Sequence, residues 1–106
     1  MMKLKADELS IVQGILADVV PACEVRAFGS RVHGNRLKPF SDIDLAVISP
    51  TPLPLHMLGE LNERFTASDL PYKVDVVDYA AASTAFQNMI DQDYEVIQQP
   101  RTERCD

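Results

Sequence analysis

The most constraining feature of this sequence is a pair of acidic residues inside an apolar stretch. The segment "SDIDLAVIS", residues 41–49, places Asp42 and Asp44 among aliphatic residues. Side chains alternate faces along a strand, so the two aspartates point the same way, about 6.6 Å apart, while Ile43 and Leu45 face a core. Carboxylates this close repel each other unless protons or a cation neutralise them. The segment therefore predicts a central β-strand with a charged site on one face.

A third aspartate lies in a second apolar stretch. "YKVDVVDY", residues 72–79, is typical of a strand and flanks Asp75 with valines. Three carboxylates suit hard divalent ions such as Mg²⁺, and phosphoryl-transfer sites commonly hold two metal ions about 3.5–4 Å apart. Taken singly, these aspartates could also be strand-end residues facing water, or helix caps. Asp78 is expected on the opposite face from Asp75, as a turn residue.

The segment before the paired aspartates favours phosphate binding. Gly29 permits a close backbone approach to a ligand, and Ser30 at a helix start offers a hydroxyl beside free backbone N–H groups. Alone, this dipeptide is an ordinary turn; between a strand and an acidic strand it indicates a nucleoside triphosphate site. Neither a P-loop nor a dinucleotide-binding glycine fingerprint is present. His33, in the same loop, either packs the loop or contacts the nucleotide, whereas His56 is expected on the surface of a helix.

The remaining sequence patterns predict an α/β fold with a small mixed sheet and flanking helices. Helices are expected over residues 7–20 and 55–68, and from Ser83 to Pro100; strands are expected over residues 23–29, 41–49 and 72–79. Asp7 is expected to cap the first helix. We expect one domain over residues 1–100, followed by a frayed tail over residues 101–106.

Composition narrows the classes of partner and compartment. With a formal net charge of −6, the chain repels polyanions, which argues against direct nucleic-acid binding. No segment approaches the roughly 20 apolar residues of a membrane helix. Cys23 and Cys105 fit no zinc spacing and are expected as free thiols. The N-terminal segment has no apolar signal core, so the cytoplasm is the expected compartment.

The motifs "FGSRVHG", "PFSDIDLAV" and "VDVVD" resemble the minimal nucleotidyltransferase (MNT) family of the DNA polymerase β superfamily. The resemblance implies a polymerase-β-like nucleotidyltransferase fold. It also implies that Asp42, Asp44 and Asp75 are catalytic and bind two Mg²⁺ ions. The nucleotide-binding residues implied by the Gly-Ser loop are Gly29, Ser30 and Arg31, with ATP as the substrate.

Small MNT proteins of this kind are often antitoxins paired with a HEPN-domain ribonuclease toxin. The resemblance therefore implies transfer of AMP from ATP to a tyrosine of that partner, in a hetero-oligomer with the toxin. Asp75 is the expected base for the acceptor hydroxyl. Two alternatives stay open: a binding module that inhibits the toxin without catalysis, or a nucleotidyltransferase for a small-molecule acceptor. For the binding module, the last predicted helix offers a surface formed by Phe86, Met89 and Tyr94, residues that could equally pack in the core.

Overall fold

The structure is a computed structural model that describes residues 6–28, 43–70 and 73–100. Its helices are α1 (Ala6–Val19), α3 (Leu55–Ala67) and α4 (Thr84–Gln92), with a short 3₁₀ helix η1 (Tyr79–Ala81). Its strands are β1 (Glu24–Phe28), β2 (Ile43–Ile48), β3 (Val74–Asp78) and β4 (Tyr94–Gln98). Within the described ranges, no helix is long and apolar enough to cross a membrane.

The four strands form one mixed sheet in the order β3-β2-β1-β4. Strand β1 pairs antiparallel with both β2 and β4, whereas β2 pairs parallel with β3. A parallel pair needs a crossover connection, and α3 supplies it between β2 and β3. The sheet is therefore mixed and the fold is α/β, as the sequence predicted.

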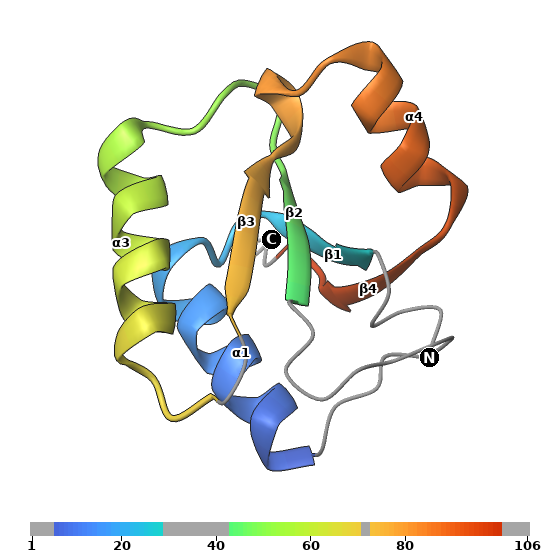
Figure 1. The fold of residues 1–106 in the computed structure, drawn as a ribbon. Helices are drawn as coiled ribbons and strands as arrows, with labels where there is room; N and C mark the ends of the chain where they lie inside the picture. Colours follow the sequence, from blue (N-terminus) through green and yellow to red (C-terminus); the bar gives the residue numbers. More distant parts are fainter. Residues whose placement is uncertain (1–5, 29–42, 71–72, 101–106) are drawn as a thin grey trace, which may run out of the picture.

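One face of the sheet carries the main hydrophobic core. Helices α1 and α3 lie side by side over this face (Figure 1), which we call the core face. Val12 and Leu16 from α1 and Leu61 from α3 are fully buried against it. Ile43 and Leu45 point into the same core, as their alternation with the aspartates predicted. An ion pair of 3.0 Å between Arg64 and Asp18 links the two helices at the surface.

Helix α4 and η1 pack against part of the opposite face, which we call the site face because Asp44 and Asp75 lie on it. Its apolar cluster is smaller and centres on Phe28, Ala46 and Ile90. The rings of Phe28 and Phe86 meet edge to face, with centroids 5.9 Å apart. This contact packs α4 against the strand that carries Phe28.

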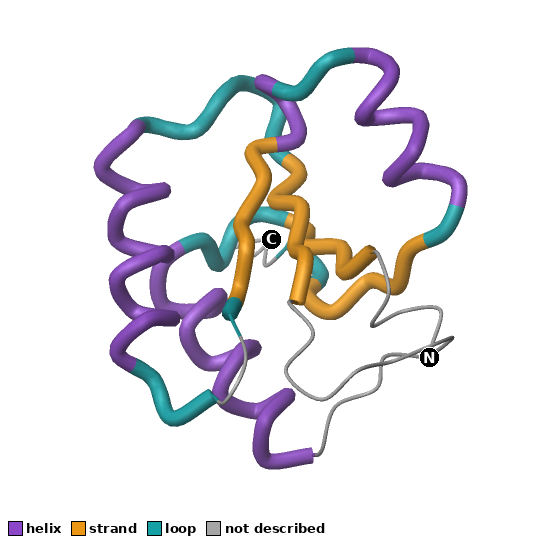
Figure 2. The backbone as a smooth tube through the Cα atoms, in the orientation of Figure 1, coloured by secondary structure: helices purple, strands orange, loops and turns teal. Residues whose placement is uncertain are grey.

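The prediction for the C-terminal region was wrong in one respect. Ser83 opens α4 as predicted, accepting a hydrogen bond of 3.2 Å from the Phe86 amide. The helix, however, ends at Gln92, and the next residues form β4 (Figure 2). Tyr94 lies four residues after Ile90, a spacing that fits a helix. Strand β1, however, has a second edge, and residues 94–98 form hydrogen bonds with its backbone groups as β4. Tertiary pairing therefore overrides the local helical spacing.

Smaller differences concern single residues. Helix α1 begins at Ala6, so Asp7 lies inside its first turn and accepts a hydrogen bond of 3.0 Å from the Glu8 amide. A carboxylate in the first turn still favours the helix through its dipole. Asp78 ends β3 and is not a turn residue, although it does lie on the opposite face from Asp75.

Candidate functional site

Asp44 and Asp75 form a register pair between the parallel strands β2 and β3. Adjacent strands lie about 4.8 Å apart, and paired residues point to the same face of a sheet. The two carboxylates therefore leave neighbouring strands side by side on the site face. Asp44 is partly buried, and the side chain of Asp75 is 42% exposed. This arrangement offers oxygen ligands to a cation that approaches from solvent.

The same register extends across the whole sheet. Phe28 pairs with Asp44 on one side and with Tyr94 on the other. Asp75, Asp44, Phe28 and Tyr94 consequently form one row across β3, β2, β1 and β4. Phe28 is nearly buried and is the residue that precedes Gly29 in the sequence. Strand β1 thus ends, at Phe28, in register with Asp44.

The other predicted site residues lie outside the described residues. They are Asp42, Gly29, Ser30 and Arg31, together with His33 of the same loop. Over the described ranges, no group of three acidic, histidine or cysteine side chains gathers to hold a metal ion. The two aspartates that are described fit a hard divalent cation in donor type and spacing, with Asp42 as the expected third ligand.

Positive charge reaches the site face from two described residues. Lys73, just before β3, places its Nζ 3.7 Å from Oδ1 of Asp75. The carbonyl oxygen of Lys73 accepts a hydrogen bond of 2.9 Å from the amide of Ile43, the residue before Asp44. This bond fixes the backbone of Lys73 next to the start of β2. Sequence reasoning did not single out Lys73, although its position two residues from Asp75 could have shown it.

Arg26 is the second cation and joins four elements. It bonds Glu24 of β1 at 2.6 Å and Asp91 of α4 at 3.0 Å. Its guanidinium also lies over the rings of Tyr94 in β4 and Tyr79 in η1, 4.3 and 5.8 Å from their centroids. We call these five residues the Arg26 cluster. The cluster links α4 to strands β1 and β4 on the site face of the sheet.

Charge within the Arg26 cluster shifts two pKa values. Burial lowers the pKa of Arg26, but the hydrogen bond to Glu24 and the surrounding acids outweigh burial and raise it overall. The hydroxyl of Tyr79 donates a hydrogen bond of 2.8 Å to Asp91. That bond, followed by desolvation, raises the pKa of Tyr79 above its ordinary value. Both groups therefore keep their protons at neutral pH, and the cluster stays intact.

Asp78 has a structural position on the core face. Its Oδ2 accepts a hydrogen bond of 2.8 Å from the Leu53 amide, which anchors the proline-rich connection between β2 and α3. Burial, and secondly the charge of Asp78, raise the pKa of the free thiol of Cys23. A thiol with a raised pKa is a poor nucleophile at neutral pH. Neither residue belongs to the site face.

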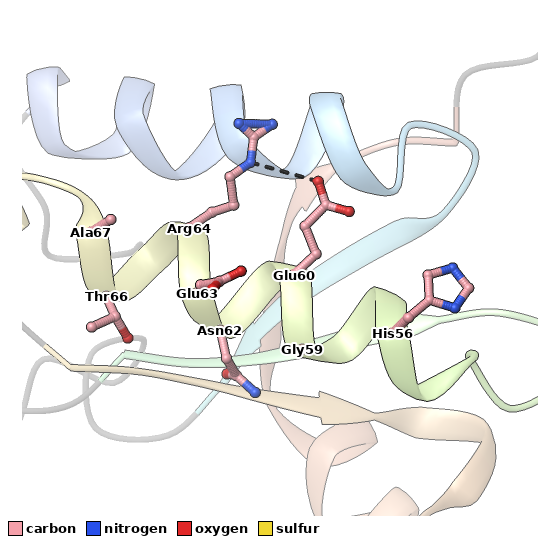
Figure 3. Close-up of a pocket in the computed structure, with 8 residues that line it drawn as sticks. All are labelled: His56, Gly59, Glu60, Asn62, Glu63, Arg64, Thr66 and Ala67. Atoms are coloured by element: carbon pink, nitrogen blue, oxygen red, sulfur yellow. Dashed lines mark ion pairs between the residues drawn. The ribbon is translucent and has the colours of Figure 1, made fainter.

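A hollow of about 1080 Å³ runs along the exposed side of α3. Figure 3 shows its lining, in which His56 stands at one end and Arg64 is paired with Glu60 at 3.9 Å. His56 is exposed, as predicted. A second hollow, of about 570 Å³, lies between α3 and β3 and is lined by Asn62, Lys73 and Asp75 among others. Of these two hollows, the second reaches a carboxylate of the site, that of Asp75.

Two sequence comparisons match most of the chain. A family model described as polymerase beta, nucleotidyltransferase matches residues 20–102, a region that contains Asp42, Asp44 and Asp75. The "Probable protein adenylyltransferase MntA" of Haemophilus influenzae is 46% identical over 98 residues. That alignment covers 92% of this chain and 85% of the relative.

Solved structures share the fold at lower identity. One chain of a toxin-antitoxin crystal structure with AMP-PNP superposes with a TM-score of 0.72 at 28% identity, covering 88% of this chain and 74% of that one. One chain of tri-AMPylated Shewanella oneidensis HEPN toxin in complex with MNT antitoxin superposes with a TM-score of 0.68 at 26% identity. That match covers 91% of this chain and 73% of the other.

Proposed function

The chain belongs to the polymerase β nucleotidyltransferase family, and we propose that it is an antitoxin that transfers AMP from ATP to a tyrosine of a partner HEPN toxin. The observation that carries the proposal is the register pair of Asp44 and Asp75 on the open site face. The 46% identity to a probable protein adenylyltransferase supports the reaction class. The likeness to toxin-antitoxin complexes supports the kind of partner.

The roles of individual residues are part of this proposal. Asp42, Asp44 and Asp75 hold two Mg²⁺ ions, while Gly29, Ser30 and Arg31 hold the triphosphate. The bound ions neutralise charge that develops on the phosphate oxygens during in-line displacement. The toxin's tyrosine oxygen bonds to the α-phosphorus of ATP, the bond from that phosphorus to the bridging oxygen breaks, and pyrophosphate leaves. Asp75 accepts the tyrosine proton.

The sheet dictates the side from which the acceptor approaches. Helices α1 and α3 cover the core face, so the tyrosine must reach the carboxylates over the site face. Met89 and Tyr94, 49% and 37% exposed, lie on the elements that flank this approach. The proposed assembly is accordingly a hetero-oligomer in which the toxin rests beside α4 and β4. Use of ATP supports the cytoplasm as the compartment.

The decisive experiment supplies the protein with its partner and each nucleotide. The chain is incubated with a HEPN toxin, Mg²⁺ and one of the four ribonucleoside triphosphates, and the products are analysed by intact and peptide mass spectrometry. We expect an added AMP on a partner tyrosine, with ATP only and not in EDTA. Absence of a nucleotidyl adduct with every nucleotide would contradict the proposal.

Two variants separate catalysis from binding. Asp75→Asn should lower the rate of AMP transfer by at least about 10²–10³-fold, the range seen when one charge-stabilising group is lost from an active site. Met89→Ser leaves the carboxylates intact and tests the exposed surface. If Asp75→Asn still neutralises the toxin in EDTA, the protein acts by occlusion. If AMP appears only on added small molecules such as an aminoglycoside, the acceptor is of that class.

A further inference from the structure

We propose that Lys73 is a displaceable counter-ion of Asp75: its ammonium group holds the carboxylate while metal is absent and competes with the divalent cation for it. The inference rests on the metal site of the proposed function. It begins from the distance of 3.7 Å between Nζ of Lys73 and Oδ1 of Asp75. A cation at that distance partly offsets the repulsion between Asp75 and the neighbouring Asp44.

A hydrogen bond holds the backbone of Lys73 in place, whereas its ammonium group is exposed to solvent. Its carbonyl accepts a hydrogen bond from the Ile43 amide, so its Cα is tied to β2 at the edge of the site. Lys73 and Asp75 are two residues apart, which places both on the site face. The Lys73 side chain is nonetheless 73% exposed and borders the 570 Å³ hollow beside α3. The ammonium group can therefore leave Asp75 without disturbing the strand.

The other described cations cannot serve this role. Over the described ranges, Arg26, Arg64 and Lys73 are the arginine and lysine residues. Arg26 is 18% exposed and is engaged by Glu24 and Asp91. Arg64 lies on α3, where it pairs with Asp18 and Glu60 at the surface of the core-face layer. Lys73 alone among the three contacts a carboxylate of the site.

A metal ion and Lys73 compete because they need the same oxygen atoms. A divalent cation on Asp75 carries twice the charge of the ammonium and repels it at contact distance. Binding of the metal thus requires Lys73 to move away, and the free energy of the ion pair is subtracted from the metal affinity. Exposed ion pairs are weak, so removing the lysine should tighten metal binding by about two- to fivefold.

The test measures Mn²⁺ affinity by electron paramagnetic resonance, without nucleotide and again with saturating non-hydrolysable ATP analogue. Lys73→Gln should bind Mn²⁺ about two- to fivefold more tightly than the unaltered chain in at least one of these titrations. Lys73→Arg keeps the positive charge and should restore the original affinity. Arg64→Gln removes one positive charge from the other layer and should change affinity less than twofold.

A second readout uses stability and needs no activity. Because metal binding stabilises the folded state by mass action, Lys73→Gln should gain more thermal stability from a given Mn²⁺ concentration than the unaltered chain does. Equal affinity in Lys73→Gln and in the unaltered chain would overturn the proposal. Weaker Mn²⁺ binding with nucleotide and unchanged binding without it would also overturn the proposal, because Lys73 would then act on the phosphates and not on Asp75. AMP transfer by the unaltered chain, assayed separately, tests the proposed function independently.

Discussion

The two faces of the sheet bury different chemistry. Between the core face and helices α1 and α3 lie mainly aliphatic side chains, including the fully buried Leu16 and Leu61. The site face carries a smaller apolar cluster around Phe28 and Ile90, and beside it the Arg26 cluster and the two aspartates. Contacts of the first kind are strong and non-directional, whereas those of the second kind depend on geometry and charge.

The core face therefore contributes most of the stability, and the site face of the same sheet carries the candidate site. A strand residue on the core face can contribute to stability while its neighbour in sequence contributes to a polar site, because alternate side chains point to opposite faces. In β2, Ile43 and Leu45 lie on one side and Asp44 on the other. Substitutions on the two faces should therefore change different measured quantities.

The largest expected effect on stability comes from the core face. Leu61→Ala removes a fully buried side chain and leaves a cavity, so the free energy of unfolding should fall by about 2–5 kcal/mol in urea denaturation. Mn²⁺ affinity, measured well below the midpoint of thermal unfolding, should stay close to that of the unaltered chain. A fall of less than 1 kcal/mol, or a lost metal site in the folded variant, would break the division between the faces.

The Arg26 cluster should give an intermediate effect. Arg26→Ala leaves Glu24 and Asp91 without their cation and removes the stacking on Tyr94, so stability should fall by about 1–3 kcal/mol. The matched variant Arg64→Ala removes the exposed ion pairs with Asp18 and Glu60 on the other layer and should cost about 0–1 kcal/mol. Equal costs for the two variants would show that the Arg26 cluster is no more than a surface network.

The aspartate pair should affect chemistry and leave stability almost unaltered. Asp75→Asn relieves repulsion from Asp44 but also loses the ion pair with Lys73, and these contributions oppose each other. The free energy of unfolding without metal should thus change by less than about 1 kcal/mol. Stabilisation by Mn²⁺ should be strongly reduced, which differential scanning fluorimetry can measure. A variant that loses several kcal/mol without metal would give Asp75 a structural role.

The smallest effect concerns the ionisation of Tyr79. Its hydrogen bond to Asp91, and secondly burial, raise its pKa in the folded state above the ordinary value of about 10. The resulting stabilisation is fully present below the unfolded pKa and is lost as the pH rises through the folded pKa. Phenolate absorbance should show one tyrosine that ionises late in the unaltered chain. In Asp91→Asn, Tyr79 should ionise nearer the ordinary value; unchanged titration there would contradict the assigned cause.

Most of the fold followed from local patterns. Apolar spacing predicted α1 and α3, and the runs of aliphatic residues predicted β1, β2 and β3, because the burial of each element repeats at its own period. Strand β4 could not be found in this way. Tyr94 fits both a helix and a strand, and only the free edge of β1, which is far away in sequence, decides between them.

The site was predictable in its parts but not in its alignment. Alternation predicted that Asp44 faces away from the core, yet its register with Asp75 depends on how β2 and β3 pair. The Arg26 cluster was also missed, because Asp91 and Tyr94 reach Arg26 only after α4 and β4 have folded over the sheet. Long-range contacts of this kind have no signature in any short segment.

The pairing of β4 with β1 also has a consequence for synthesis on the ribosome. The chain emerges from its N-terminus, so β1 is available long before residues 94–98 exist. Until then, one edge of β1 presents unpaired backbone groups, which can recruit strands from neighbouring nascent chains. Chains that stop before Tyr94 would keep that edge open permanently. Pairing with β4 makes β1 an interior strand, and the edge of the sheet on this side becomes the outer edge of β4, a strand of five residues.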